Sequence, residues 1–255
     1  MGITANKVGH EDRITLVDHL DELRTRAISS LIAFAAALAL CFWQNHLLLE
    51  VVNAPLPEGR LPITFGVAEP FTTTLTVSAY GAILLALPVI LYHAYAFALP
   101  ALKPGERRAV TPFLIAAPAL FVAGVGFAHF VVIPAATGFL LNFNASEFNI
   151  EIRAREYYSF FAMAAFAVGI LFQIPVGVMA VTRLGIFTPQ QIASNRRYAV
   201  LAIAVTAMLL PGTDPVTMLV SMAPLVALFE GSLLLARVFH RPREAPTADP
   251  VADPG

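Results

Sequence analysis

Two glutamates in strongly basic surroundings are the first side chains of this sequence able to bind a charged ligand. Glu22 lies in the stretch 19–26, which reads HLDELRTR, and Glu106 lies in 102–108, which reads LKPGERR. Two carboxylates on one surface would suit a ligand with two guanidinium groups, because charge-assisted and often bidentate hydrogen bonds join these groups. The alternative is local: Glu22 pairs with Arg26 at spacing i,i+4, and Glu106 lies in a first helical turn, where the dipole favours an acid. The residues alone leave both interpretations open.

Other kinds of chemistry leave no pattern in the chain. The motifs HExxH, GxSxG, GxGxxG and the P-loop are missing. The single cysteine, Cys41, excludes a disulfide scaffold and a cysteine zinc site. His93 and His129 fall within apolar stretches, where we expect hydrogen-bonded structural roles. We therefore predict no catalytic residue, no metal and no cofactor, and the net charge of −1 gives no reason to expect nucleic acid as a partner.

Composition decides the class of protein. Of the 255 residues 58% are hydrophobic and only 13% are charged, and the mean hydropathy is +0.73. Soluble domains are about 45–50% apolar and about 25% charged. Too few polar side chains are present to coat a water-soluble protein of this size, so we predict an integral membrane protein.

A membrane helix needs about 20 mostly apolar residues. Six such segments can be cut between the charges, and we predict an all-α protein with six spans. The fifth is short, and the turn signal Pro211–Pro215 separates it from the sixth. The segments are Ala27–Trp43, Thr72–Leu99, Ala109–Ile133, Ser159–Val181, Tyr198–Leu210 and Pro215–Val238.

Prolines recur inside these spans, and each removes a backbone hydrogen bond and bends its helix. They are Pro88, Pro118, Pro175 and Pro224. We favour a bundle of curved helices that pack into a cupped shape over a set of gating hinges. Residues 44–71, rich in proline, are expected to form a stiff, non-helical loop, and residues 134–158, which are mostly polar, a second loop on the same side.

Basic residues orient the chain, because cytoplasmic loops are enriched in Lys and Arg. With six spans, one side holds 13 of the 16 basic residues and the other side only Arg60, Arg153 and Arg155. Both termini are then cytoplasmic. A short amphipathic helix at about 15–26 leads into the first span, a single membrane domain covers 1–240, and a disordered tail covers 241–255.

Four motifs in order resemble one family. They are the HLDELRTR stretch, the run Ala86–Arg108 with its LKPGERR end, Phe172–Pro175 (FQIP), and Pro211–Glu230 with Asp214-Pro215 and Phe229-Glu230. Together they are similar to the TatC family, the core subunits of the twin-arginine protein translocase. The likeness covers residues 15 to 240, and the family's six spans and cytoplasmic termini agree with the count above.

The resemblance implies a receptor and scaffold in the cell membrane. Such proteins recognise twin-arginine signal peptides on folded cargo and recruit single-span subunits of the TatA/TatB type. The resulting oligomeric complex exports the cargo with the proton-motive force. By carry-over, Glu22 and Glu106 would contact the paired arginines, and Arg24 would shape the same surface. Arginine suits this role better than lysine, because its fork of N–H groups matches a carboxylate.

Three further polar residues fall in the motifs. Gln173 holds a position where the family commonly has glutamate, and it would contact a partner's membrane helix or bond a neighbouring helix of this chain. Asp214 is expected to cap the sixth helix with Pro215 at its first position, or to contact cargo. Glu230 is expected to snorkel, to pair with Arg237, or to line the cargo path.

A small-molecule secondary transporter with proline-hinged helices is the alternative function. Such folds are commonly built from internal repeats. The sequence shows no repeat between spans one to three and spans four to six, because Thr72–Leu99 and Tyr198–Leu210 differ in length and pattern. An intramembrane enzyme would need paired catalytic residues at membrane depth, which are missing.

Overall fold

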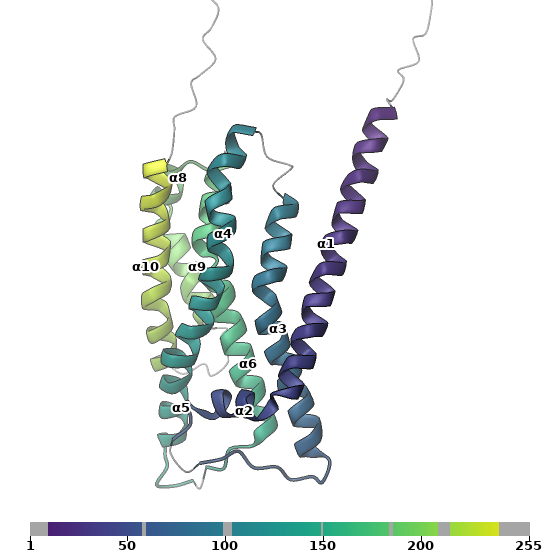
Figure 1. Ribbon diagram of the computed structural model, residues 1–255. Coiled ribbons are helices and arrows are strands. Elements are labelled where there is room, and N and C mark those ends of the chain that lie inside the picture. Colours follow the sequence, from purple (N-terminus) through teal and green to yellow (C-terminus); the bar gives the residue numbers. More distant parts are fainter. Residues whose placement is uncertain are drawn as a thin grey trace, which may run out of the picture.

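The protein is a bundle of helices (Figure 1). This computed structural model describes residues 10–57, 60–98, 104–148, 150–183, 186–208 and 215–239. Its helices are α1 (His10–Trp43), α2 (Asn45–Asn53), α3 (Glu69–Ala98), α4 (Pro104–Phe127), the π-helical turn η2 (Ala128–Val132), α5 (Ile133–Asn142), α6 (Ala154–Leu171), α7 (Ile174–Arg183), α8 (Pro189–Ser194), α9 (Arg196–Met208) and α10 (Pro215–Phe239).

Five segments of the described chain are long and apolar enough to cross a membrane. The segments are His19–Trp43, Glu69–Phe97, Ile115–Asn142, Ala154–Thr182 and Met218–Arg237. The predicted all-α membrane architecture is therefore confirmed. The predicted short fifth span coincides with α9, a helix of 13 residues, and its crossing of the membrane stays a prediction.

The loop prediction was wrong in two places. Residues 44–71 contain α2, because the prolines begin only at Pro55, and the apolar run before them forms a helix. The third span continues through η2 into α5 and ends at Asn142 instead of Ile133. Pro134 lies in the first turn of α5, where a proline needs no backbone donor and does not stop the helix.

The bundle has two distinct ends, which we name by what they contain. The terminal end holds the start of α1, the end of α3, the start of α4 and the end of α10 (Figure 1). The α2 end holds α2 and the loops before α3 and α6. The start of α1 and the end of α10 thus lie at the same end of the molecule.

The core forms where α4 crosses α6. Gly124 and Gly169 face each other there, and a Cβ added to Gly169 would lie 2.5 Å from Cε2 of Phe121. Phe121 is fully buried, so the missing side chains allow the two backbones to approach closely. Within the segment Ala154–Thr182, which spans α6 and α7, half of the residues in its apolar 18-residue stretch are buried. In the corresponding stretch of α1 only 6% are buried. The apolar surface of α1 is therefore left for lipid or for another chain.

The loops of the α2 end are fastened to the bundle by polar contacts. The Tyr157 hydroxyl donates to the carbonyl oxygen of Val52 at 2.7 Å, which holds α2 against α6. Ile63 pairs with Arg153 in an isolated β-bridge. Segments far apart in the sequence thus meet at this end.

Candidate ligand-binding site between α1 and α3

The carboxylate of Glu22 holds a guanidinium. Nε and Nη2 of Arg26 lie 3.0 Å and 2.6 Å from Oε1 of Glu22. Nδ1 of His19 lies 3.9 Å from Oε2 of the same carboxylate. The Glu22 side chain is 33% exposed and that of Arg26 is 25% exposed. The local alternative raised by the i,i+4 spacing is therefore the arrangement that the structure contains.

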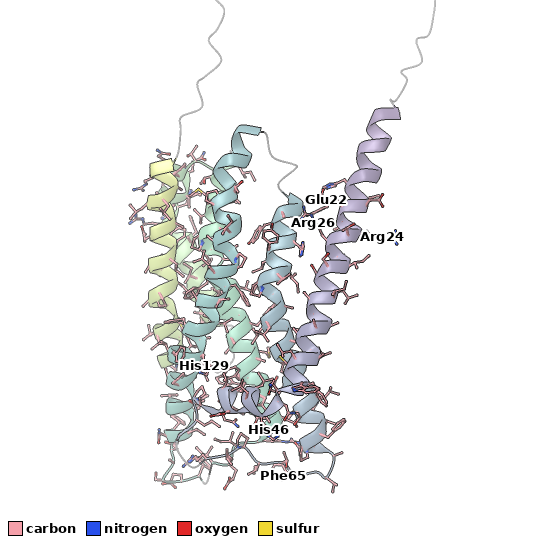
Figure 2. The ribbon with its side chains drawn as sticks, viewed as in Figure 1. Glu22, Arg24, Arg26, His46, Phe65 and His129 are labelled. Atoms are coloured by element: carbon pink, nitrogen blue, oxygen red, sulfur yellow. The ribbon has the colours of Figure 1, made fainter. Side chains whose placement is uncertain are left out.

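Contacts to α3 fix this part of α1 on the bundle. The His19 ring stacks on Phe97, with the ring centroids 4.2 Å apart. Figure 2 shows Glu22 and Arg26 on the side of α1 that faces α3, and Arg24 on the side that points away. A helix advances 3.6 residues per turn, so two residues of spacing place Arg24 on nearly the opposite face. The structure does not bring Arg24 onto the surface that holds Glu22.

Two cavities adjoin the Glu22–Arg26 pair. One, of about 480 Å³, which we call the polar cavity, is lined by residues that carry polar groups: Asp21, Glu22, Thr25, Arg26, Ser29 and His93. The other, of about 570 Å³, is mainly apolar and is lined by Leu23, Arg26, Ala27, Ser30, Leu31, Phe34, Ile90, His93, Ala94 and Phe97. Arg26 and His93 line both cavities. A ligand with a cationic head and an apolar continuation would find matching surfaces side by side.

The other acids predicted as site residues are placed differently. Glu106 lies in the first turn of α4, and its side chain lies outside the described residues. Asp214 also lies outside them. Oε2 of Glu230 lies 3.4 Å from Nη2 of Arg196, so Glu230 pairs with the start of α9 and not with Arg237 on its own helix. Folding decides this pair, because 34 residues separate the partners.

Gln173 lies in the turn between α6 and α7 and is 9% exposed. Its Nε2 donates to the carbonyl oxygen of Ala117 in α4 at 3.1 Å. Its Oε1 is buried and has no hydrogen-bond partner in the described part of the chain. A buried acceptor without a donor costs about 1–3 kcal/mol. The amide thus bonds a neighbouring helix and still has one unused acceptor.

The expectation that both intramembrane histidines are hydrogen-bonded was wrong at one nitrogen of each. Nδ1 of His93 and Nδ1 of His129 are buried and have no partner among the described residues. Their rings contact aromatic neighbours instead, and His129 lies edge-on to Phe130 with the centroids 4.6 Å apart. The sequence did not lead us to expect that His93 lines the site. The feature that could have revealed His93 is its position as an ionisable residue within an apolar span, because such residues are functional candidates by default.

The residues present suit a cationic ligand better than a metal. In the described ranges, no group of three or more His, Cys, Asp or Glu side chains is placed to hold a metal ion. Glu22 shows with Arg26 that its carboxylate takes a guanidinium through two N–H groups. The site can therefore exchange one guanidinium for another without building a new binding geometry.

Comparison with known proteins identifies the family. The profile of the family described as "Sec-independent protein translocase protein (TatC)" matches residues 18–224. The chain belongs to the TatC family. Family membership confirms the resemblance seen in the four motifs, and it favours a part in protein transport over the small-molecule transporter.

Individual TatC proteins match over most of this chain. The Sec-independent protein translocase protein TatC of Escherichia coli K12 is 34% identical over 234 residues, which is 90% of each protein. TatC of Halothiobacillus neapolitanus is 33% identical over 239 residues, and the match covers 92% of this chain but 65% of that relative. A crystal structure of the twin arginine translocase receptor TatC in DDM superimposes with a TM-score of 0.73 at 32% identity, covering 86% of this chain and 99% of that one.

Proposed function

We propose that this TatC-family protein is the receptor and scaffold subunit of a twin-arginine translocase in the cell membrane. It binds the signal peptides of folded cargo proteins at the terminal end of the bundle. It recruits single-span subunits of the TatA/TatB type, and the proton-motive force drives transport. The membrane potential supplies about 2.3 kcal/mol per charge for each 100 mV. The protein itself carries out no chemical reaction.

The observation that carries this proposal is the occupied carboxylate of Glu22. Arg26 places two N–H groups on one oxygen at 2.6 and 3.0 Å, which is the geometry that an arginine of a signal peptide would use. In the complex, a peptide guanidinium replaces that of Arg26. The carboxylate keeps one cation through the exchange, and the displaced Arg26 guanidinium, 25% exposed in the pair, turns toward water. Glu106, at the start of α4, would take the second arginine of the pair.

The adjoining apolar cavity would hold the apolar stretch of a signal peptide. Signal peptides place an apolar stretch of about 7–15 residues after their basic part. The cavity of about 570 Å³ shares Arg26 with the polar one. The apolar stretch would therefore begin along Leu31 and Phe34 once the arginines have reached the acids.

We further infer that the terminal end faces the cytoplasm. The start of α1 and the end of α10 share this end (Figure 1), which requires an even number of crossings. With the five long spans, α9 would supply the sixth. Arg24, Arg26 and Arg237 lie toward this end, and Arg153 and Arg155 toward the other. Enrichment of Lys and Arg in the cytoplasmic parts of the sequence supports this orientation.

Crosslinking tests the receptor function. A photoreactive residue at Thr25 samples the polar cavity, one at Leu31 samples the apolar cavity, and one at Glu50 in α2 is the control. A twin-arginine signal peptide is expected to crosslink at Thr25 and Leu31 and not at Glu50. Replacing both peptide arginines with lysines should reduce the yield, because lysine matches a carboxylate less well. Yields that do not depend on the arginines would contradict the proposed site.

A separate prediction concerns Gln173 and the single-span subunits. Gln173→Leu removes both the bond to Ala117 and the unused acceptor, so we expect the folded protein to lose about 1 kcal/mol of stability or less. Oε1 is buried, so a partner helix would have to pack over this turn and shift its neighbours to donate to it. Such a partner would lose its hydrogen bond in the variant, and co-purification of the single-span subunits should fall severalfold. Signal-peptide binding should persist.

Ser232→Ala is the matched control for Gln173→Leu. Ser232 is also buried and polar, but its hydroxyl donates within its own helix to Phe229 at 2.6 Å. Unchanged assembly of the Gln173→Leu variant would leave Gln173 with only its internal role, the bond from the α6–α7 turn to α4.

A further inference from the structure

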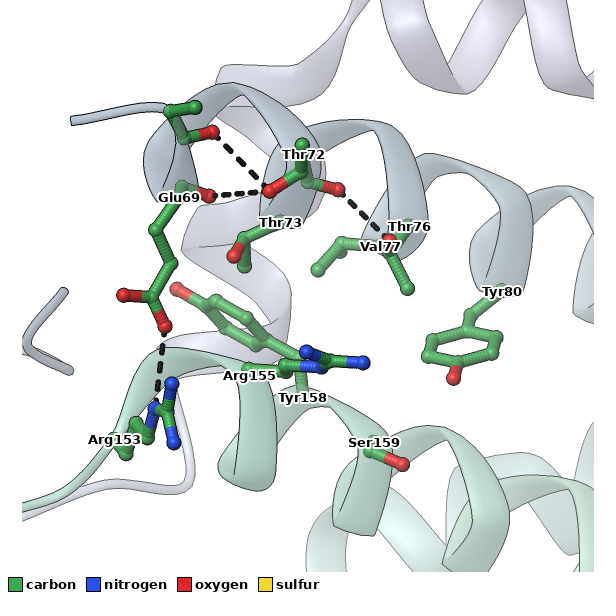
Figure 3. Close-up of a pocket in the computed structure, with 11 residues that line it drawn as sticks. Glu69, Thr72, Thr73, Thr76, Val77, Tyr80, Arg153, Arg155, Tyr158 and Ser159 are labelled. Atoms are coloured by element: carbon green, nitrogen blue, oxygen red, sulfur yellow. Dashed lines mark hydrogen bonds and ion pairs between the residues drawn. The ribbon is translucent and has the colours of Figure 1, made fainter. Parts of the chain in front are cut away.

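A cavity of about 580 Å³ lies at the α2 end, between the beginnings of α3 and α6 (Figure 3). It is separate from the site between α1 and α3. Six side chains with hydroxyl groups line it, together with one carboxylate and two guanidinium groups. The hydroxyl-bearing residues are Thr72, Thr73, Thr76, Tyr80, Tyr158 and Ser159.

The carboxylate of this cavity, Glu69, is already fully engaged. Oε2 accepts hydrogen bonds from the backbone N–H groups of Phe65 at 2.7 Å and Gly66 at 3.1 Å. Oε1 accepts from Nε of Arg153 at 3.2 Å. The Glu69 side chain is only 12% exposed. Glu69 and Arg153 therefore balance each other within the wall of the cavity.

Arg155 carries the one positive charge of the lining that no carboxylate in the cavity balances. Among the described residues, no carboxylate lies within ion-pair distance of its guanidinium, whereas Arg153 contacts both Glu69 and Glu156. Figure 3 shows the Arg155 side chain lying across the cavity between α6 and α3, toward Tyr80. The lining thus has an excess of one positive charge on a group with five N–H donors. An oxyanion is the ligand that matches such a group.

The hydroxyl groups differ in what they can offer. Oγ1 of Thr72 donates to Ala68 and Glu69, and Oγ1 of Thr76 donates to Thr72, so these protons are used within α3. Tyr80 on α3 and Ser159 on α6 lie farther along the two helices, beyond the end of the Arg155 side chain (Figure 3). The Ser159 hydroxyl donates to Sδ of Met163 at 4.0 Å, a weak bond that an anionic oxygen would replace. The hydroxyls of Tyr80 and Ser159 are therefore the donors best placed to join Arg155 on a ligand oxygen.

The depth of the cavity in the membrane points to the source of the oxyanion. Two of the apolar spans begin here, at Glu69 and at Ala154, so the cavity lies where hydrocarbon gives way to lipid headgroups. Phe71 and Leu75 on α3 are 65% and 46% exposed beside it, and they offer apolar surface to acyl chains. We propose that this cavity binds the phosphate of a membrane phospholipid through Arg155, Tyr80 and Ser159. This proposal is independent of the receptor function.

Native mass spectrometry of the detergent-solubilised protein tests the proposal. Dioleoylphosphatidylglycerol is titrated against the wild type, Arg155→Ala and Arg60→Ala, the last being a control that removes an arginine from the same end of the bundle. Arg155→Ala should weaken the tightest lipid binding at least about tenfold, because bonds to a charged group are the strong ones. Arg60→Ala should bind as the wild type does. Tyr80→Phe should weaken binding by a smaller factor.

Two further ligands separate the possible sources of affinity. Digalactosyl diacylglycerol has a lipid body without phosphate and should bind no better to the wild type than to Arg155→Ala. Inorganic phosphate at the same concentration should not displace the phospholipid. Equal phosphatidylglycerol binding by wild type and Arg155→Ala overturns the proposal, and displacement by inorganic phosphate overturns its lipid part. If Arg155→Ala does not fold, Tyr80→Phe and Ser159→Ala decide the same question, and wild-type binding by both overturns the proposal.

Discussion

Replacing Glu22 with glutamine is expected to weaken binding of a twin-arginine signal peptide by about ten- to a hundredfold. Glutamine keeps the size of the side chain but removes the charge that holds a guanidinium. Hydrogen bonds to charged groups contribute about 1.5–3 kcal/mol, and each 1.4 kcal/mol is a factor of ten in affinity. The fold should not change, because the side chain is one-third exposed and glutamine can still bond Arg26.

Fluorescence anisotropy of a labelled signal peptide measures this effect on detergent-solubilised protein. Glu50→Gln, which neutralises an exposed acid on α2 at the other end of the bundle, is the matched control. Wild-type affinity in the Glu22→Gln variant would show that the peptide binds elsewhere. A loss of the same size in both variants would point to the overall charge of the protein and not to this carboxylate.

The largest effect on stability is expected at Gly169. An alanine there places its Cβ 2.5 Å from Cε2 and 2.9 Å from Cδ2 of Phe121. Phe121 is completely buried, so neither the ring nor the adjoining backbone of Gly124 can give way without moving α4 from α6. Overpacking of this kind costs about 1–3 kcal/mol. We expect a clear fall in the melting temperature of Gly169→Ala in detergent.

The chain offers a matched control for this substitution. Gly177 lies in α7, and a Cβ added there meets no atom within 4 Å. Gly177→Ala should leave the melting temperature unchanged or raise it, because alanine is favoured over glycine inside a helix by about 1 kcal/mol. Equal melting temperatures for the two variants would mean that the crossing of α4 and α6 is looser than the structure has it.

The state of Glu22 has a consequence for how the receptor would work. Its carboxylate is paired with Arg26, and a half-buried acid without a partner is costly. Arg26 thus stabilises the Glu22 carboxylate and also competes with an incoming arginine. Binding then draws on the second contact, at Glu106, and on the apolar continuation of the peptide as well as on Glu22.

Composition and local pattern were sufficient for the outline of this protein. The low share of charged residues indicated a membrane protein, because spans must be apolar whatever their arrangement. The i,i+4 spacing of Glu22 and Arg26 offered, as one of two interpretations, a pair that lies within one helix and needs no other element. The weakest points were the loops: α2 and the continuation past Pro134 were missed, because a short amphipathic helix and a proline in a first turn resemble loop signals.

Only the tertiary structure decided contacts between distant segments. The sequence offered Arg237, on the same helix, as an ion-pair partner for Glu230. Helix packing instead brings Nη2 of Arg196, on another helix, to 3.4 Å from Oε2 of Glu230. The cavity beside Arg155 joins residues of α3 and α6 that lie more than 70 positions apart. Local spacing determines which residues share a helix face, since the backbone repeats regularly. Which faces meet depends on how all the helices pack at once, and that is settled only in the folded molecule.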